Sequence, residues 1–524
     1  MTAQVTGRAV APHPISTSLL QTLAAGVRST GSDTVAVEEV FTGTTMINLR
    51  CADVDDVDDF VVRARNAQPA WAARPFRDRA KIVADCLAQV RRNRNTMLDL
   101  IQAETGKGRW DAFIELLEPN LTLSYYLRHG AKLLAPSRRE SMAPFVVKTV
   151  QSQHPVGVVG VIAPWNFPYA LGISDSMTAL LAGNAVVLKP DPQTSLNALY
   201  LASMLQRAGL PADVFQVLVG PGEVGAALVD HVDYVAFTGS AVTGREVARR
   251  AGERLVGCSL ELGGKNAMIV LEDADLETVA HDALRACFMN AGEVCMAIEK
   301  IFVPQPALES FLDLFTVATD GLEYAAGYDF SGTFGSLTNK AQLTKVEGFV
   351  RRAVQEGARV VRGGIARPDI GPYFYEPTIL VDVAVGMEIY LEEVFGPVVS
   401  VFGYDTVGEA IELANHGDFG LNASVYGRNI KQAKSVAARI RAGTVNINEG
   451  FAAAYGSIGA AAGGVGQSGV GRRHGPEGLL KYTEAQTVAM QHFALQEPPA
   501  WLPRNLTSAV ATHAYGLLNR LSIR

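Results

Sequence analysis

Cys295 ends the segment NAGEVC, residues 290–295, in which asparagine, alanine and glycine precede the sulfur. The segment follows an apolar helical stretch at 284–288. A sulfur on a turn of small residues is accessible to a ligand, and nearby backbone N–H groups can stabilise a thiolate or an oxyanion. A lone cysteine is more often a small buried apolar residue, so Cys295 is a candidate nucleophile that needs partners.

Two further segments offer such partners. ELGGKN, residues 261–266, places the carboxylate of Glu261 before two glycines, where backbones approach closely. A buried glutamate usually has a partner or a task, and the simplest alternative is an ion pair with Lys265. PWNFP, residues 164–168, holds the amide donor of Asn166 in a loop fixed by two prolines. Its alternative is a structural asparagine at a strand end.

Three other segments are suited to a nucleotide. In FTGS, residues 237–240, Ser240 follows Gly239 and is expected to cap a predicted helix whose first N–H groups can bind phosphate. Lys189, at the end of a predicted strand, can hold a ribose hydroxyl or a phosphate. EEVFGPV, residues 392–398, places the carboxylate of Glu393 near the ring of Phe395. Taken singly, Lys189 and Glu393 are better explained as exposed charges at strand ends.

Strands and helices alternate along the regions that carry these segments. The expected strands are 156–162, 185–189, 214–219 and 234–238, and the expected helices 175–182, 195–207, 222–228 and 241–251. A second alternating stretch includes 267–271, 276–289, 300–303, 307–319, 342–356 and 443–447. This alternation predicts an α/β fold with parallel sheets covered on both faces, which typically bind a nucleotide beyond the strand C-termini.

The remaining segments predict accessory structure. Residues 1–45 have no clear period and are expected to form an irregular arm, and helices are expected at 54–68, 76–105 and 111–134. Segments 141–153 and 484–493 each resemble a strand; together they predict a protruding antiparallel flap, with a plain sheet edge as the alternative. The tail from about 495 carries an apolar helical stripe that is expected to dock on the protein itself, or else on a membrane surface.

Composition limits the class of protein. The chain has 524 residues, which implies two or three domains. A net charge of −7, with acids and bases mixed, predicts neither a nucleic-acid partner nor a membrane partner. Five cysteines without a Cys-x-x-Cys pair argue against a disulfide framework or a metal site. The N-terminal residues lack an apolar signal segment, so a cytoplasmic location is expected.

The order and spacing of these motifs, together with SGVGR at 468–472, resemble the aldehyde dehydrogenase superfamily from about residue 35 to residue 493. Within it, stretches such as LAGNAVVLKPD, SLELGGKN, RPDIGPYFYEPT and GVGRRHGPEGLLKYTE are similar to succinate-semialdehyde dehydrogenases of the actinobacterial type. The resemblance implies a Rossmann-like cofactor-binding domain at 1–140 and 154–261 and a catalytic domain at 262–470. It also implies an oligomerisation flap at 141–153 and 484–493, a tail at 494–524, and a homodimer or homotetramer.

The resemblance also implies a mechanism for aldehyde oxidation. Cys295 would attack the aldehyde, and Asn166 with the backbone N–H of Cys295 would hold the oxyanion. Glu261 would act as the base that activates water to hydrolyse a thioester. A CoA-acylating enzyme needs no such base, so Glu261 argues against that alternative. A binding protein without activity is disfavoured because all three groups are present.

Cofactor-binding roles carried over from the resemblance fall on Glu393 and Phe395 at the nicotinamide side and on Lys189 at the adenosine ribose. Trp165, Gly239, Ser240 and Gly263 are expected to complete the site. Many NAD-preferring members of the family have a glutamate three residues after the lysine, whereas Pro192 stands there in this chain. Without that carboxylate a 2′-phosphate is not repelled, so NADP is the expected cofactor and NAD the alternative.

Three positions depart from the family pattern. Glu293 replaces a glutamine, and its carboxylate would raise the pKa of the thiol if it faced Cys295. Ser174 and Met289 stand where many semialdehyde dehydrogenases have arginines for the substrate carboxylate. Succinate semialdehyde remains the expected substrate, with Arg472, Arg473 and Arg128 as candidate replacements. The alternative is an aliphatic or aromatic aldehyde in an apolar pocket lined by residues such as Phe167, Phe451 and Tyr455.

Overall fold

The computed structural model describes residues 13–141, 147–491 and 501–520. A six-stranded sheet, in the order β17-β9-β8-β5-β6-β7, forms one of its two centres. Five strands are parallel, namely β5 (Val158–Ile162), β6 (Ala185–Lys189), β7 (Phe215–Val217), β8 (Tyr234–Thr238) and β9 (Gly257–Glu261). Their apolar runs are buried by helices on both faces, which confirms the predicted parallel sheet.

One face of this sheet is covered by the core that includes α6 (Pro168–Ala182) and α7 (Ser195–Arg207). The other is covered by α2 (Asp56–Ala72), α8 (Gly222–Val229) and α9 (Ala241–Glu253). Helix α6 begins seven residues before the predicted start at 175. All its residues are buried, so it has no polar face and no helical period from which its start could be predicted.

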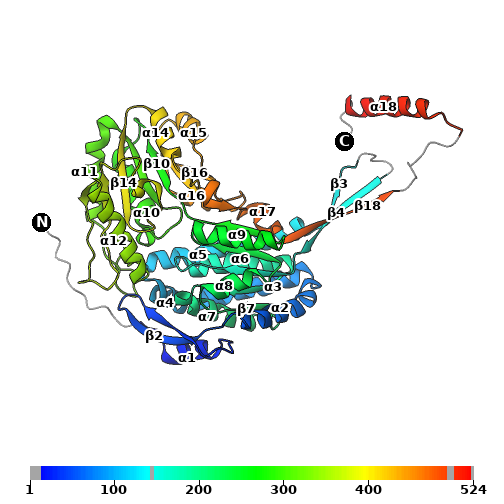
Figure 1. Ribbon diagram of the computed structural model, residues 1–524, viewed down its shortest axis with the longest axis horizontal. Coiled ribbons are helices and arrows are strands. Elements are labelled where there is room, and N and C mark those ends of the chain that lie inside the picture. The colour runs from blue at the N-terminus through cyan, green and yellow to red at the C-terminus, as the bar shows by residue number, and fades with distance from the viewer. Residues whose placement is uncertain (1–12, 142–146, 492–500, 521–524) are drawn as a thin grey trace.

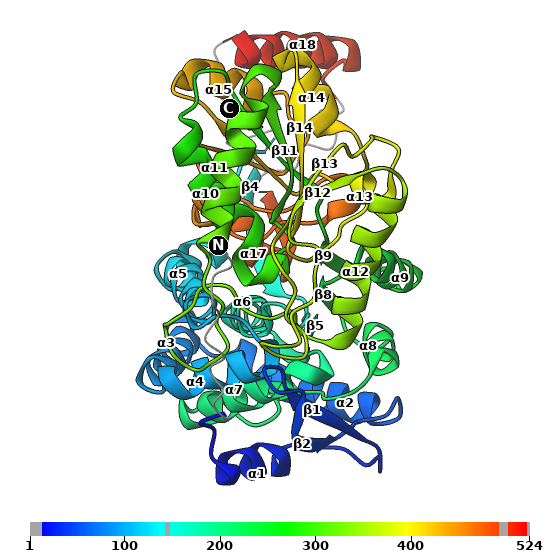
Figure 2. The ribbon, with the colours of Figure 1, turned by 90° about the vertical axis from the view of Figure 1, so that its left-hand side faces the viewer.

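A seven-stranded sheet forms the second centre, in the order β12-β13-β14-β11-β10-β15-β16. Its strands are β10 (Asn266–Val270), β11 (Ile298–Pro304), β12 (Arg359–Arg362), β13 (Thr378–Val381), β14 (Val398–Tyr404), β15 (Asn422–Tyr426) and β16 (Thr444–Ile447). One face packs on α10 (Leu276–Phe288), α11 (Leu308–Asp320) and α12 (Lys340–Gln355), and the other on α14 (Val407–Asn415) and α15 (Ile430–Ala437). Figure 2 shows this α/β part above the first one.

The chain then returns to the first sheet. Strand β17 (Gly469–Val470) pairs antiparallel with β9, with Gly469 opposite Glu261. Helix α17 (Gly475–Leu480) then packs on α5 (Arg109–Leu134) and on α6. Residues 469–470 therefore extend the first sheet rather than the second α/β part, in which they were predicted. A Cβ on Gly469 would lie 1.9 Å from the carbonyl oxygen of Leu260, so glycine is needed for this close pairing.

Two predictions for the N-terminal third are wrong. From residue 13 the predicted arm is ordered as α1 (Thr17–Ala25) and a hairpin of β1 (Thr34–Glu39) and β2 (Thr44–Arg50), whose mostly polar strands gave no clear alternation. Residues 1–12 lie outside the described part. The single helix predicted at 76–105 is two helices, α3 (Phe76–Arg92) and α4 (Arg94–Thr105), separated at Asn93. Helix α5 (Arg109–Leu134) follows as predicted.

A three-stranded antiparallel sheet protrudes from the body of the molecule (Figure 1). In this sheet β4 (Val147–Pro155) lies between β3 (Ser137–Arg139) and β18 (Thr483–Gln491). Strands β4 and β18 are joined by nine residue pairs, from Thr483–Pro155 to Gln491–Val147. The predicted pairing of the two distant segments is confirmed. Residues 142–146 and 492–493 of the predicted flap lie outside the described residues.

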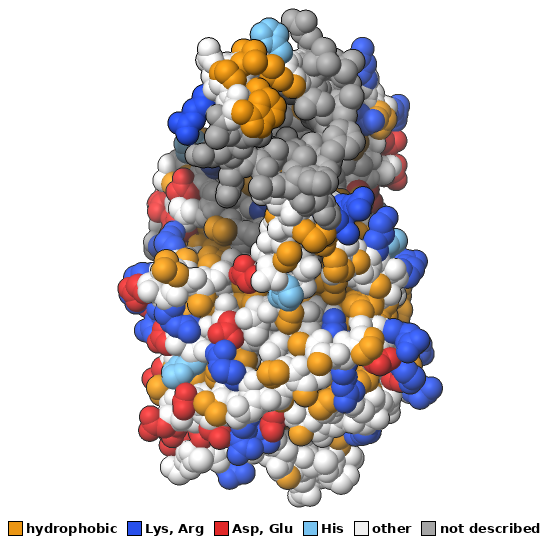
Figure 3. All heavy atoms as spheres, turned by 90° about the vertical axis from the view of Figure 1, so that its right-hand side faces the viewer, with side chains coloured by type: hydrophobic (Ala, Val, Ile, Leu, Met, Phe, Trp, Pro, Cys, Tyr) orange, Lys and Arg blue, Asp and Glu red, His pale blue; other side chains and the backbone are white. Residues whose placement is uncertain are grey.

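The C-terminal tail forms the predicted helix, α18 (Arg504–Arg520). Leu506 and Val510 on this helix are exposed, and hydrophobic side chains gather around it on the face shown in Figure 3. Docking of the tail is therefore not seen at Val510; Leu521 and the side chains of Leu517 and Leu518 lie outside the described part, so docking of the apolar stripe stays a prediction. Residues 494–500 and 521–524 lie outside the described part. Among the described helices none is long and apolar enough to cross a bilayer.

Candidate active site

A cavity of ≈ 280 Å³ is lined by residues from both α/β parts. Asn166, Glu261 and Cys295, which are far apart in the chain, all line it. The predicted pocket residues Phe167, Phe451 and Tyr455 line it too, together with apolar side chains from α5 and α6. The structure thus brings together the three residues predicted to be catalytic and the three predicted to contact substrate.

Cys295 is held by a tight turn. The 3₁₀ segment Met289–Gly292 contains three residues with positive φ, namely Asn290 (52°), Ala291 (51°) and Gly292 (74°). A Cβ on Gly292 would lie 2.2 Å from the carbonyl oxygen of Gly396. The Asn266 amide donates to the carbonyl oxygen of Cys295 (2.8 Å), which fixes the backbone beside the sulfur.

The thiol of Cys295 is protonated at neutral pH in the free chain. Burial raises its pKa to about 12, and the carboxylates of Glu393 and Glu261 add to that rise. Since only the thiolate is a strong nucleophile, the sulfur needs a nearby proton acceptor or a change in its surroundings before it can attack.

Glu261 is an available proton acceptor for a water molecule. Its Oε1 atom is buried and has no hydrogen-bond partner within the described residues. Burial raises its pKa, and the positive charges of Arg473 and Lys481 oppose that rise. The alternative pairing with Lys265 is not formed, because Lys265 binds Glu299 instead (Nζ–Oε2, 2.5 Å). A carboxylate with a raised pKa beside a cavity is suited to general base catalysis near neutral pH.

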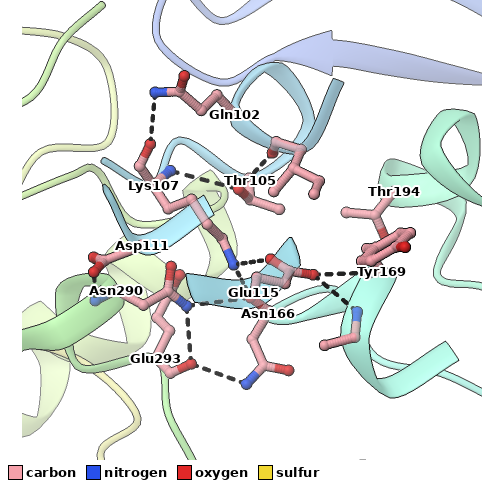
Figure 4. Close-up of polar contacts among 12 residues, drawn as sticks. Gln102, Thr105, Lys107, Asp111, Glu115, Asn166, Tyr169, Thr194, Asn290 and Glu293 are labelled. Atoms are coloured by element: carbon pink, nitrogen blue, oxygen red, sulfur yellow. Dashed lines mark hydrogen bonds and ion pairs between the residues drawn. The ribbon is translucent and has the colours of Figure 1, made fainter. Parts of the chain in front are cut away.

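Asn166 is fixed from two directions (Figure 4). Its Nδ2 atom donates to the carbonyl oxygen of Glu293 (2.9 Å), which leaves the second amide hydrogen for another acceptor. The backbone carbonyl oxygen of Asn166 accepts from Lys107 Nζ (2.6 Å) and from Asn290 Nδ2 (3.2 Å). The amide donor is therefore preorganised at the cavity wall.

Lys107 belongs to a fully buried ion pair that the sequence did not reveal. Its Nζ lies 2.5 Å from Glu115 Oε2, and the other carboxylate oxygen of Glu115 accepts from the backbone N–H of Tyr169 (2.8 Å). The pair thus joins α5 to the first turn of α6, beside Asn166. The only sequence signal was a lysine placed between two glycines, Gly106 and Gly108.

The side chain of Glu293 turns away from the cavity. Its carboxylate accepts from the backbone N–H (3.1 Å) and the hydroxyl (2.8 Å) of Thr338. It is fully buried, and that burial raises its pKa to about 8. Its backbone carbonyl, rather than its carboxylate, reaches the site through Asn166.

The predicted cofactor residues lie at strand and helix ends. Lys189 ends β6 and is buried, with Nζ donating to the carbonyl oxygen of Pro190 (3.1 Å). Ser240 caps α9 by accepting from Thr243 N–H (3.2 Å), as predicted. Glu393 accepts from Gly264 N–H (2.9 Å). The rings of Trp165 and Phe395 meet edge to face, with centroids 5.5 Å apart.

These residues fit a nicotinamide dinucleotide. A buried ammonium with a single carbonyl partner among the described residues keeps donors for a ribose hydroxyl or a phosphate. A Cβ on Gly263 would lie 2.1 Å from Glu393 Oε2, so the glycine leaves that carboxylate its place. Gly239 precedes the N-terminus of α9, whose free N–H groups suit a pyrophosphate.

None of the three arginines proposed as carboxylate ligands is free inside the cavity. Arg473 lines it, but its guanidinium donates to Asp175 and to Thr238 Oγ1 (2.7 Å). Arg472 donates to backbone carbonyls at Gly464 and Gly471. Arg128 is exposed on α5 and is not part of the cavity wall. Ser174 donates to Glu118 Oε2 (2.9 Å), and Met289 contributes an apolar side chain to the wall.

Residues 27–488 match the model of the aldehyde dehydrogenase family. The chain belongs to this family. It is 48% identical over 474 residues to a putative succinate-semialdehyde dehydrogenase [NADP(+)] 2 of Mycobacterium ulcerans, which covers 90% of this chain and 92% of that protein. A 4,4'-diapolycopene aldehyde oxidase of a Methylomonas species is 34% identical over 447 residues, covering 84% and 83%.

Solved structures agree with the fold of this aldehyde dehydrogenase. A Mycobacterium tuberculosis aldehyde dehydrogenase complexed with NAD+ superposes with a TM-score of 0.85 at 34% identity, covering 90% of this chain and 97% of that one. An NADP-dependent enzyme of E. coli gives the same TM-score at 30% identity, covering 89% and 96%. The predicted α/β aldehyde dehydrogenase fold and the enzyme class are thereby confirmed.

Proposed function

We propose that this enzyme oxidises succinate semialdehyde to succinate with NADP, through a thioester on Cys295. The observation that carries the proposal is the convergence of Cys295, Glu261 and Asn166 on one cavity. The substrate and the cofactor are supported by the names of the mycobacterial relatives, which match over nine-tenths of the chain.

In the first half of the reaction the thiol of Cys295 loses its proton to solvent, its sulfur forms a bond to the aldehyde carbon, and the carbonyl electrons move to oxygen. The free hydrogen of the Asn166 amide and the backbone N–H of Cys295 stabilise this oxyanion. One such donor contributes about 2.7–4 kcal/mol in comparable sites. The bound nicotinamide supplies the acceptor for the hydride that leaves the carbon. The carbonyl then reforms as a thioester.

In the second half Glu261 takes a proton from water, and the hydroxide attacks the thioester carbon. The carbon–sulfur bond breaks, the thiolate leaves, and the carboxylate product is released. Burial of Glu261 favours this role because a raised pKa makes the carboxylate a stronger base.

NADP preference rests on the surroundings of Lys189. Pro192, the first residue of the 3₁₀ turn Pro192–Thr194, carries no charge that would repel a 2′-phosphate, and Lys189 is available to bind it. The ratio of kcat/KM with NADP to kcat/KM with NAD tests this. We expect NADP to be favoured, and Pro192→Glu to reverse the preference by about tenfold or more. A bias of the unaltered enzyme towards NAD would contradict the assignment.

A second candidate substrate class is an apolar aldehyde. The cavity wall is made mostly of aliphatic and aromatic side chains, and one relative is named for oxidation of a long apolar aldehyde. The formation of reduced NADP should therefore be followed by absorbance with succinate semialdehyde, hexanal and benzaldehyde as substrates, each with and without CoA. Preference for hexanal or benzaldehyde would favour the second class, and dependence on CoA would indicate acylation instead of hydrolysis.

We also infer a homodimer or homotetramer in the cytoplasm. The protruding sheet has exposed apolar side chains on β18, including Val488 and Met490, and such surfaces mark sites of association. All five cysteines are free, which suits a reducing compartment.

A further inference from the structure

Arg285 is a cation at the cavity that the proposed mechanism does not use. It lies in the last turn of α10, four residues before Met289, and its exposed side chain contributes to the cavity wall. It forms no salt bridge with a carboxylate of the described residues, although its positive charge lowers the pKa of the buried Asp111, which burial raises. The other arginine of the wall, Arg473, is already bound to Asp175.

The guanidinium of Arg285 lies over the ring of Phe451, with 5.9 Å from the guanidinium carbon to the ring centroid. Phe451 also packs in the apolar cluster that contains Met289, Met296 and Cys295. Through the Phe451 ring the cation therefore contacts the apolar cluster that surrounds the nucleophile. A cation–ring contact of this kind does not consume the N–H donors of the guanidinium, which suit a planar anion.

The position of Phe451 is fixed by close packing. A Cβ on the preceding Gly450 would lie 2.6 Å from the side chain of Ala286, which follows Arg285 on α10. The loop that carries Phe451 is thus pressed against the end of the helix that carries Arg285. The arginine and the ring form a built feature of the wall.

The acidic groups of the same wall are already engaged. Glu115 is paired with Lys107, and Glu118 accepts from Ser174 and from Thr122. Glu261 lies at the reacting end. A carboxylate buried in this apolar cavity needs a donor, because losing hydration without gaining a partner is costly. Of the two wall arginines, Arg473 is held by Asp175 and Thr238 through one terminal nitrogen, and its buried Nε has no partner among the described residues.

We infer that Arg285 binds the distal carboxylate of an ω-carboxy aldehyde and replaces the arginines missing at positions 174 and 289. The inference rests on the proposed function and names the residue that selects its substrate class. The carbonyl end of the aldehyde meets Cys295, and the carboxylate lies at the exposed mouth of the cavity.

The test compares succinate semialdehyde with butanal, which has the same chain length but no carboxylate. We expect Arg285→Met to lower kcat/KM for succinate semialdehyde about ten- to hundredfold, mainly through KM. The value for butanal should stay within about twofold. Arg285→Lys should retain part of the preference. Arg128→Met is the matched control, because it removes an exposed arginine outside the cavity wall, and it should behave as the unaltered enzyme.

Inhibition by succinate gives a second readout, since binding of the product does not require turnover. Arg285→Met should raise the inhibition constant of succinate by about the same factor as it raises KM for succinate semialdehyde. If Arg285→Met leaves both quantities unchanged while the unaltered enzyme prefers succinate semialdehyde to butanal, the inference is overturned and the proposed function stands. If the unaltered enzyme shows no such preference, both are contradicted.

Discussion

Burial at the residue scale gives the two reacting groups their chemistry. The same apolar cavity raises the pKa of Cys295 to about 12 and raises the pKa of Glu261 above its usual value. The sulfur is thereby held as a thiol in the free chain, and the carboxylate becomes a better base for water. Catalysis thus depends on two groups whose ionised forms are both disfavoured by their surroundings.

Glu261→Gln should separate the two halves of the reaction. Without a base the thioester forms but is not hydrolysed, so we expect a rapid burst of about one reduced cofactor per active site, followed by very slow turnover. Cys295→Ser should show neither burst nor turnover. Stopped-flow absorbance measures both. Sustained turnover by Glu261→Gln at the rate of the unaltered enzyme would remove the proposed role of this residue.

Glu293 should affect stability rather than catalysis. Its pKa is raised to about 8 by burial, from a reference value of 4.5. The folded chain therefore holds this proton more tightly than the unfolded chain, and stability falls as pH rises from about 4.5 through about 8. We expect Glu293→Gln to stabilise the fold by about 3 kcal/mol more at pH 8 than at pH 5.

Thermal unfolding at the two pH values measures this effect, and kcat/KM should change by less than about twofold. The reason is that the carboxylate binds Thr338 while only the backbone carbonyl of Glu293 touches Asn166. A shifted pH–rate profile would instead reveal electrostatic coupling to Cys295.

At the scale of elements, the junction of α4, α5 and α6 positions the oxyanion donor. Lys107 stands between α4 and α5, and Glu115 on α5 accepts from the N–H groups of Tyr169 and Ala170 at the start of α6. The carbonyl of Asn166 closes this arrangement through Lys107. Because both charges are fully buried, neither can be solvated if its partner is removed.

We expect Lys107→Met to cost about 3–5 kcal/mol of unfolding free energy, because it leaves Glu115 buried and unpaired. Glu115→Gln should also destabilise the fold. The double variant should lose clearly less than the sum of the two, and urea denaturation of all four proteins gives the coupling energy. Additive losses would indicate that the two residues act independently.

For the whole molecule, the three-stranded flap is a part that a single chain leaves uncovered. Val488 and Met490 on β18 are 57% and 49% exposed. We expect the double substitution Val488→Asp with Met490→Asp to shift the protein towards monomer in light scattering, because two carboxylates would be buried at the contact. Val242→Asp on α9, where valine is 73% exposed, is the control and should not change the mass. An unchanged mass for the double variant would place the contact elsewhere.

The local motifs of the sequence were enough to predict four of the six strands of the first sheet, namely β5 to β8, together with the cap at Ser240, the pairing of the flap strands and the family. Such features depend on neighbours in the chain or on apolar runs that a buried strand requires. The same means identified Cys295, Glu261 and Asn166, since each lies in a short segment that contains glycine or proline. The N-terminal hairpin and the early start of α6 had no such periodic signal.

The direction of side chains was decided only by tertiary structure. The carboxylate of Glu293 accepts from Thr338, Lys107 forms an ion pair with Glu115, and the guanidinium of Arg285 lies over the ring of Phe451. Each contact joins residues that are not neighbours in the sequence. Strand β17 likewise joins the first sheet because Gly469 fits against Leu260. The physical reason is that burial and pairing of a charge depend on everything packed around it, whereas a motif specifies only the backbone that carries it.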